Sequence, residues 1–262
     1  MTSATKTLEL LSFFSEQHPE IGLSQFCKLT GRDKATTYRH LQSLEIVGFI
    51  EKNPLTKKYR MGPAVLPLAQ IRERTVPRKS AAKASVEQLA DATGETAHVS
   101  VLSGTTLYSL VAVESPKHST RAIVDLKTLP LHATASGICT LAYGPDILTQ
   151  TAKQNLERFT AKTQTTEQGL DAAIQRVKET GFSHSKGSIE EDIYGLSAPL
   201  FDQSGTIAGA VSVASVATRF NADAERTIKH QLILASRQIS HNWGGSIPNP
   251  IEACWSKTLA ET

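Results

Sequence analysis

One polar stretch of the chain has the residue types to form hydrogen bonds outside the protein. It covers residues 33–45, where helical spacing places Thr37, Leu41 and Leu44 on one apolar face. The opposite arc has small residues first and hydrogen-bonding side chains after them: Ala35, Thr36, Arg39, Gln42 and Ser43, flanked by Tyr38 and His40. A helix that enters the major groove of DNA needs this order, because the backbone must come close before donors reach base edges. The pattern favours a groove-reading helix over a merely solvated one, which usually carries more Glu and Lys.

The preceding segments are those that would position such a helix. A first helix is expected from about Lys6 to the proline at 19, since proline disfavours helix at the residue before it. A second helix of about two turns is expected, with Ser24 as its N-cap and Gly31 as the left-handed residue that follows it. Asp33 can cap the third helix. Together these segments predict a helix-turn-helix.

A basic hairpin is expected after the third helix. Residues 49–52 and 58–61 are predicted to be short strands, and residues 53–57 form the turn between them. Lysine and arginine side chains on such a wing can reach phosphates, which give affinity without reading sequence. Residues 1–62 are therefore predicted to be a winged helix-turn-helix domain. Its candidate DNA-binding residues are Lys34, Ala35, Thr36, Tyr38, Arg39, His40, Ser43, Lys57, Lys58 and Arg60.

The distribution of charge fits this division of the chain. Residues 1–80 contain 13 Lys and Arg against 7 Asp and Glu, whereas residues 81–262 contain 15 against 18. A basic head on a mildly acidic body suits a head that meets phosphate, although chance clustering on a solvated face explains the numbers equally well. The three cysteines are widely spaced and form no disulfide framework. With neither a secretory signal nor an apolar run of about 18 residues, we expect a cytoplasmic location without membrane association.

The remainder of the chain predicts a linker and a second domain of the α+β class. Residues 63–80 should form a linker helix starting near Pro63, with Pro67 able to kink it. Helices are expected at residues 81–92, 132–143, 166–180 and 221–243, and strands at 95–102, 107–113, 122–124, 182–188, 193–201 and 207–216. Helices separate from a largely antiparallel sheet in this pattern. Residues 81–243 would form the domain, and residues 244–262 a loose C-terminal tail.

Three motifs resemble those of IclR-type bacterial transcriptional regulators. Residues 30–41, followed by Leu44, Gly48 and Phe49, are similar to the family's T-G-L-P-K-S-T-V-Y-R-L-L motif and the residues after it. Residues 129–137 resemble L-P-L-H-A-T-A-x-G, and residues 195–213 resemble I-A-A-P-V-F-D…G…A-L-S-V. The chain departs from the first motif at Arg32, Asp33 and His40, which affects the operator that would be recognised more than DNA binding itself.

The resemblance implies a ligand-responsive regulator with a GAF-like effector domain. It implies a homodimer or homotetramer, paired linker helices, a pseudo-palindromic operator of double-stranded DNA and control of catabolic genes. The ligand would be a small carboxylic or aromatic acid bound where the sheet meets the helix near residue 135, since a helix N-terminus suits a carboxylate. Carried over by position, the effector-binding residues are Ala135, Ser136, Gly137, Asp192, Gly195, Ser212 and Ala214. Departures at Asp192, Gly195 and Ala214 favour an acid larger or more apolar than glyoxylate.

Other classes of protein compete with this interpretation. Cys139 and His132 could act as nucleophile and base in an enzyme, but no oriented third group is evident. A metal- or redox-sensing regulator would use histidines, yet His98, His118, His132 and His184 are scattered. An architectural DNA-binding protein would leave the second domain without a role. We therefore expect no catalytic residue, no metal site and no cofactor. Structural interpretations also stay open: Ser212 as a core residue, Asp192 as a loop acid and His132 as a loop-shaping residue.

Overall fold

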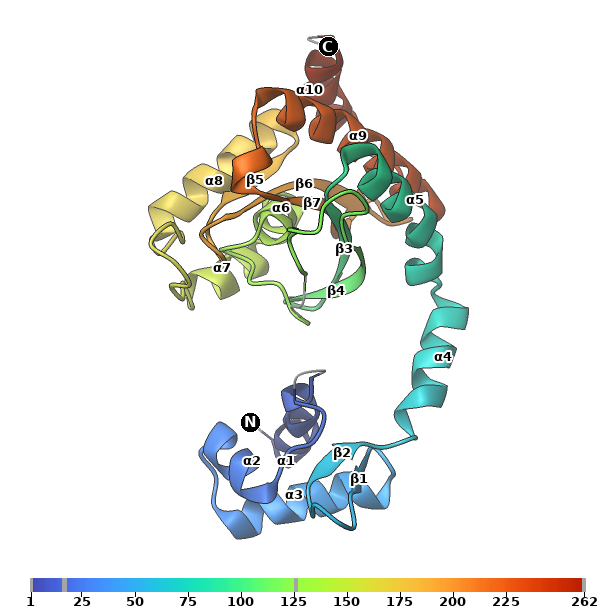
Figure 1. The fold of residues 1–262 in the computed structure, drawn as a ribbon, viewed down its shortest axis with the longest axis vertical. Coiled ribbons are helices and arrows are strands. Elements are labelled where there is room, and N and C mark those ends of the chain that lie inside the picture. The colour runs from blue at the N-terminus through green and yellow to red at the C-terminus, as the bar shows by residue number, and fades with distance from the viewer. Residues whose placement is uncertain (1, 16–17, 125–126, 261–262) are drawn as a thin grey trace. The chain divides into compact units, whose positions relative to one another are not determined.

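The chain folds into two compact units, Met1–Pro77 and Arg78–Thr262. The computed structural model describes residues 2–15, 18–124 and 127–260. Figure 1 shows the first unit in blue to cyan and the second in green to red. Each unit has its own hydrophobic core and is described by itself.

The first unit contains a short helical bundle and a two-stranded hairpin (Figure 1). Its core includes Leu10, Phe26, Leu41 and Tyr59, all almost fully buried. The aromatic rings of this core meet edge to face, and the Phe26 and Tyr59 centroids are 6.5 Å apart. The elements are α1 (Ser3–Glu9), η1 (Leu10–Phe13), α2 (Leu23–Thr30), α3 (Lys34–Ile46), β1 (Ile50–Lys52), β2 (Tyr59–Met61) and α4 (Val65–Thr75).

Local capping fixes the turn between α2 and α3. Gly31 adopts the left-handed conformation, with φ of 66°, after the last turn of α2. The Asp33 carboxylate accepts the Thr36 N–H at 2.9 Å and caps α3 as expected. The expectation for Ser24 as the N-cap was wrong, because α2 begins at Leu23 and its N-cap is Gly22, two residues earlier. The predicted first helix is shorter and changes to a 3-10 turn at Leu10, and residues 16–17 at its predicted end lie outside the described residues.

The linker helix predicted for residues 63–80 is shorter in the structure, because α4 covers Val65–Thr75 and residues 78–80 already belong to the next helix, α5 (Arg78–Thr93). Pro67 lies in the first turn of α4, where a missing N–H breaks no intrahelical hydrogen bond, so the helix continues through it. None of the residues of α4 is buried within its unit. Leu66, Leu68 and Ile71 are each more than half exposed.

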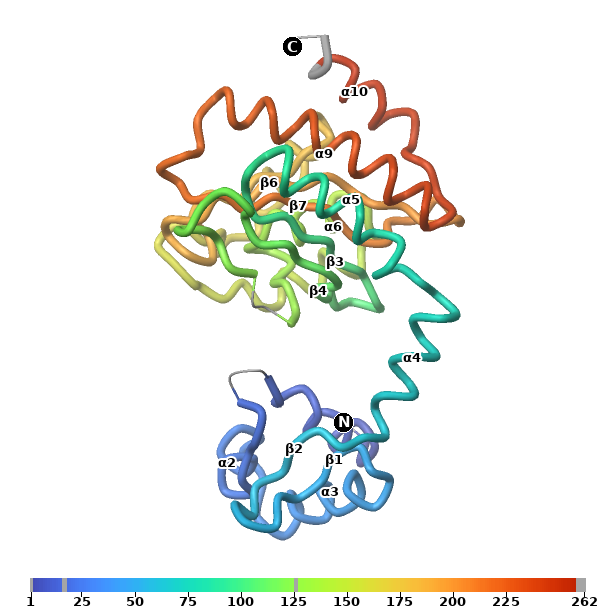
Figure 2. Tube along the Cα trace, turned by 45° about the vertical axis from the view of Figure 1, so that its right-hand side comes forward, coloured from blue at the N-terminus to red at the C-terminus, as the bar shows by residue number. Residues whose placement is uncertain are grey.

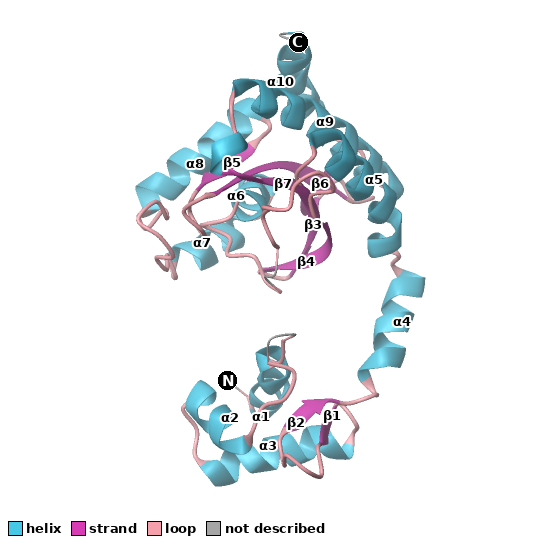
Figure 3. Cartoon of the chain, viewed as in Figure 1, coloured by secondary structure: helices cyan, strands magenta, loops and turns pink. Residues whose placement is uncertain are grey.

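The second unit is built on a five-stranded antiparallel sheet (Figure 3, magenta). The strand order β4-β3-β7-β6-β5 leaves β4 and β5 at the edges. The strands β6 and β7 both lie inside the sheet and form a hairpin, whose register pairs Ser197 with Ser212 and Gly195 with Ala214. The strands are β3 (Thr96–Ser103), β4 (Thr106–Val113), β5 (Ser183–Lys186), β6 (Ile193–Phe201) and β7 (Ile207–Val216).

Two groups of helices cover the two faces of this sheet. α5 (Arg78–Thr93) and α9 (Ala222–Asn242) cover the face that presents Val99, Val211 and Leu196. α6 (Ala135–Tyr143), α7 (Asp146–Lys153) and α8 (Glu167–Thr180) form a second core on the other side. The alternation of side chains along each strand produces these two faces. The α+β architecture with a flanked antiparallel sheet is confirmed.

The structure corrects the prediction of a strand at residues 122–124. This segment pairs with no strand, because the Ala122 carbonyl instead accepts a hydrogen bond from the Thr96 hydroxyl at 2.6 Å. α7, which lay between two predicted helices, was not anticipated. No helix among the residues that the structure describes is both long and apolar enough to cross a membrane.

The C-terminal segment also differs from its expected loose state. Residues Asn249–Ala260 form α10, which packs against α8 and α9. Trp255 is completely buried, and its indole N–H donates to the Gly181 carbonyl at 3.2 Å. Arg237 of α9 forms a two-pronged ion pair with Glu252 of α10. Apolar burial and this ion pair explain why the segment is ordered.

Candidate functional site

The outer surface of α3 is open within the first unit. Lys34, Ala35, Arg39 and Ser43 are exposed, Tyr38 is 39% exposed, and Thr36 is half-buried beside the cap. α3 and the β1–β2 hairpin lie side by side (Figure 2). The structure therefore groups most of the candidate DNA-binding residues of α3 on one accessible surface.

His40 is the exception on α3. It faces the interior at 8% exposure, and its Nδ1 lies 2.7 Å from the Thr7 hydroxyl. Burial, together with the nearby positive charges of Arg32 and Arg39, lowers the pKa of His40. Position 40 is three residues after Thr37 and therefore shares the buried side of the helix, so its proposed contact with DNA is corrected.

The wing presents its basic residues to solvent. Lys57 and Lys58 are exposed, and Arg60 is exposed but paired with Glu51 at 2.6 Å. The turn is well defined, because the Asn53 side chain accepts the Leu55 N–H at 2.9 Å and donates to Glu20 at 2.7 Å. This geometry holds the two lysines at the tip of the hairpin, where a phosphate backbone could approach them.

In the second unit, a buried polar cluster lies under α6. The Ser136 and Ser212 hydroxyls are 2.7 Å apart, and Ser212 also hydrogen-bonds to Ser197. His98 Nε2 completes the chain at 3.1 Å from the Ser136 hydroxyl. Each of these four side chains is at most 7% exposed. We call His98, Ser136, Ser197 and Ser212 the polar cluster.

The small residues predicted for the effector site lie beside this cluster. A Cβ at Gly195 would lie 3.2 Å from the Ala135 side chain, and Gly195 pairs directly with Ala214. The structure thus brings Ala135, Ser136, Gly195, Ser212 and Ala214 together from α6, β6 and β7.

Two other predicted effector residues have different surroundings. The Gly137 N–H is already bound by the Thr134 hydroxyl at 2.9 Å, which leaves the amides of Ala135 and Ser136 as the first-turn donors for a ligand. Gly137 serves packing, since a Cβ there would come within 2.5 Å of Leu131. Asp192 is exposed in the turn before β6, and its carbonyl accepts the Ala217 N–H. The structure does not group Asp192 with the buried residues.

Sequence reasoning missed two members of the polar cluster, His98 and Ser197. Alternation along β3 gives the signal for His98, since Thr96, His98 and Ser100 are polar residues on one side of a strand whose other side is apolar. Burial lowers the pKa of His98 to about 4, and its Nδ1 has no hydrogen-bond partner among the described residues. A neutral buried imidazole with a free nitrogen can bind a ligand atom.

Cys139 and His132, which could have served an enzyme, have structural roles. Cys139 is fully buried, which raises the pKa of its thiol and disfavours the nucleophilic thiolate. His132 donates to the Glu157 carbonyl at 2.8 Å and stacks on Phe159. Within the described ranges, no group of three His, Cys, Asp or Glu side chains could hold a metal ion.

A winged helix-turn-helix unit joined to an α+β unit defines a transcriptional regulator with one DNA-binding and one effector-binding domain. Residues 75–241 match the family model for the bacterial transcriptional regulator IclR C-terminal domain, and residues 3–54 match the IclR helix-turn-helix domain. The chain belongs to the IclR family.

Individual relatives agree with this assignment. The chain is 24% identical to the HTH-type transcriptional regulator XynR of Escherichia coli, covering 92% of this chain and 97% of XynR. A crystal structure of an IclR-type protein from Silicibacter sp. TM1040 superimposes with a TM-score of 0.87 at 35% identity, covering 95% and 99% of the two chains. An IclR homologue from Microbacterium hydrocarbonoxydans, solved with 4-hydroxybenzoate, has the same fold, with a TM-score of 0.73, 21% identity, and 92% and 99% coverage.

Proposed function

We propose that this regulator binds a pseudo-palindromic operator as a homo-oligomer, using α3 and the wing, and that a small organic acid alters its affinity. The proposal of DNA binding rests on the exposed arc of α3, where Ala35 allows close approach and Arg39 can reach a base edge. A single winged domain contacts few base pairs, so two copies on related half-sites would give the necessary specificity.

Substitutions in α3 and the wing test the DNA half. After selection of bound fragments from genomic DNA, gel shifts would compare Arg39→Ala and Lys57→Ala on the selected duplex and on random duplex. Arg39→Ala should cost about 1–3 kcal/mol on the selected site only, whereas Lys57→Ala should weaken binding to both duplexes alike. Lys83→Ala removes the same charge from an exposed position of α5 and serves as the control. Equal losses with Arg39→Ala on both duplexes would contradict base reading.

The polar cluster supports an acid as the effector. A carboxylate beside α6 would meet the amides of Ala135 and Ser136 and the positive end of the helix dipole. The hydroxyls of Ser136 and Ser212 now bond to each other, and each can donate to a carboxylate oxygen instead. The small side chains at 135, 195 and 214 leave few polar anchors, which favours an acid with an apolar or aromatic body. The 4-hydroxybenzoate bound by the Microbacterium homologue has this chemistry.

Calorimetric titration with a panel of acids tests the effector half. The panel would include two-carbon, longer aliphatic and aromatic carboxylic acids. We expect the larger acids to bind more tightly, and Ser212→Ala to weaken binding by about tenfold, the effect of a lost hydrogen bond to a charged group. Ser100→Ala is the matched control, because Ser100 is equally buried on the same face but bonds only to the backbone at Ala210. Tight binding of a two-carbon acid alone would rule out the proposed ligand class.

A further inference from the structure

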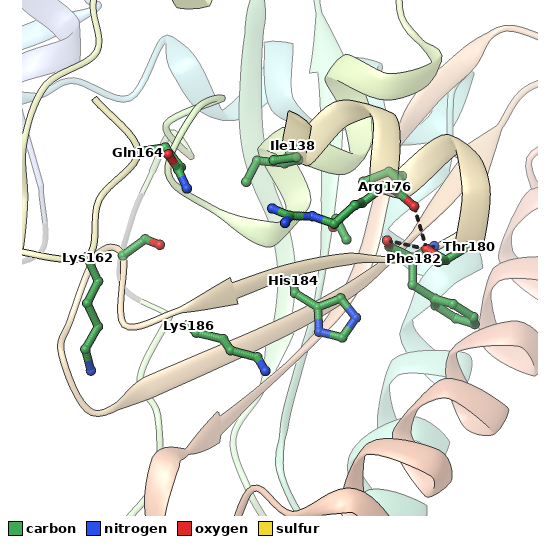
Figure 4. A pocket seen from close by; sticks show the side chains of 12 residues that line it. Ile138, Lys162, Gln164, Arg176, Thr180, Phe182, His184 and Lys186 are labelled. Atoms are coloured by element: carbon green, nitrogen blue, oxygen red, sulfur yellow. Dashed lines mark hydrogen bonds between the residues drawn. The ribbon is translucent and has the colours of Figure 1, made fainter. Parts of the chain in front are cut away.

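A cavity of the effector-binding unit lies at its β5 edge. It has a volume of about 450 Å³ and is bounded by α8, the first part of α6, the segment around residues 162–164, and β5 (Figure 4). Ile138, Val177 and Phe182 give it an apolar floor. None of the residues proposed for the effector site lines it. Ser183 of the cavity wall donates to the Ala135 carbonyl and pairs with Ser197, so the cavity adjoins the proposed effector site without sharing its residues.

The polar side chains of this cavity are basic or neutral. Lys162, Arg176 and Lys186 line it together with His184 and Gln164, and none of the described residues that line it is acidic. Among the described residues, no carboxylate lies within 4 Å of the three cationic groups. Lys162 donates only to the backbone carbonyl of Glu191, at 3.4 Å.

Two lysines near the cavity, in contrast, form ion pairs with carboxylates. Lys153 bonds to Asp171 of α8 at 2.8 Å, and Lys229 of α9 bonds to Glu225 at 2.7 Å. Glu225 also lies 3.8 Å from His184. The Glu225 carboxylate also interacts electrostatically with Lys186, but its short ion pair is with Lys229. Three cations beside one shared carboxylate leave the cavity with a net positive charge.

The walls of the cavity are fixed by hydrogen bonds. The Thr180 hydroxyl donates to the Arg176 carbonyl at 2.8 Å and approaches the Phe182 carbonyl at 3.1 Å, which ties the end of α8 to β5 (Figure 4). On the opposite side, Thr160 and Thr163 donate to the carbonyls of Gly187 and Ser188, each at 2.6 Å. A preformed wall reduces the ordering cost of binding a ligand.

We propose that this cavity binds a small organic anion carrying two or more negative charges, at a site distinct from the one proposed for the effector. The three unpaired cations select multivalent charge, since a single carboxylate would satisfy only one of them. The apolar floor suits a short carbon skeleton, and the volume is within the usual range of about 300–1,000 Å³ for small-molecule sites. A di- or tricarboxylate and a phosphorylated acid share this chemistry.

Titration with citrate tests the proposal on the full-length protein. We expect citrate to bind more tightly than acetate, and Arg176→Gln and Lys186→Gln each to weaken citrate binding by about five- to tenfold at low salt. Lys178→Gln removes an exposed charge from the same helix outside the cavity, and it should leave citrate binding within about twofold of wild type. All three side chains are exposed, so the variants should fold, which their melting curves would verify.

Further titrations distinguish support for this anion site from its rejection. Inorganic phosphate that binds with the same dependence on Arg176 and Lys186 would support the site and identify phosphate as its preferred anion. Citrate binding that survives both substitutions, absence of citrate binding, or acetate binding as tightly as citrate would overturn the proposal. Loss of citrate binding in Ser212→Ala but not in Arg176→Gln would also overturn it, because the anion would then occupy the site under α6. The proposed response to an organic acid is tested separately by its own panel.

Discussion

His98 is a fully buried ionisable side chain next to the proposed effector site, and its surroundings have consequences for stability. Burial holds the pKa of the folded-state imidazole at about 4, against about 6.5 in an unfolded chain. Between these values the unfolded state binds more protons than the folded state. The contribution of His98 to the free energy of unfolding is therefore fully present above pH 6.5, and it is lost as the pH falls from 6.5 to 4.

Replacing this histidine should flatten the pH dependence of stability. For His98→Asn, the loss of unfolding free energy between pH 7.5 and pH 4 should be smaller than in the wild type by about 3 kcal/mol. Urea unfolding at both pH values measures this difference. His184, whose pKa is also lowered to about 4, remains in both proteins and contributes equally to each. If the unfolding free energy of His98→Asn fell between the two pH values by as much as that of the wild type, the assignment of a neutral His98 with a lowered pKa would be contradicted.

The residues of the two candidate sites were not equally predictable. Spacing along α3 identified Ala35, Arg39 and Ser43, since helical periodicity alone fixes which side of a short helix faces the core. The same rule, applied strictly, places His40 inside with Thr37 and Leu44. His98 and Ser197 were not predicted as site residues. Their contacts cross from β3 to α6 and from β6 to β7, and no local sequence pattern shows that these residues touch.

At the scale of elements, strands with strong alternation were predicted best. The bounds expected for β6 and β7 agree with the structure at both ends, because the Asp202–Gly205 turn and the apolar runs leave little choice of register. The segment at 122–124 had too few residues for alternation to distinguish a strand from an extended loop. α10 was missed because its order depends on contacts with α8 and the Gly181 turn, which are remote in sequence.

α10 should contribute substantially to the stability of its unit. Trp255→Ala should lower the free energy of unfolding by about 3–5 kcal/mol, the usual cost of removing a fully buried large aromatic side chain. Urea unfolding would measure this loss. Cys254→Ala changes the adjacent, half-buried residue and should have a much smaller effect. A loss below about 1 kcal/mol for Trp255→Ala would show that α10 is not part of the folded core.

For the whole molecule, the two units assign DNA binding and ligand binding to separate parts of the chain. Any effect of the acid on operator affinity must equal the effect of the operator on acid affinity, since coupling between two binding sites is reciprocal. The size of this effect is limited by the difference in the acid's affinity for the DNA-competent and the DNA-incompetent states. The family and the architecture follow from the sequence, whereas activation or repression of transcription depends on the layout of the promoter.

The central claim is that the outer surface of α3 enters a DNA duplex, and Ala35→Glu tests it most directly. Residue 35 is exposed in the first turn of α3, where a carboxylate is compatible with the helix dipole, so the melting temperature should not fall. In the groove, the same carboxylate would be forced against phosphates and base edges. Fluorescence anisotropy with the selected duplex at low salt should show a loss of affinity of about 100-fold or more. Wild-type affinity in the folded Ala35→Glu variant, or a wild-type protein indifferent to duplex at low salt, would contradict the account.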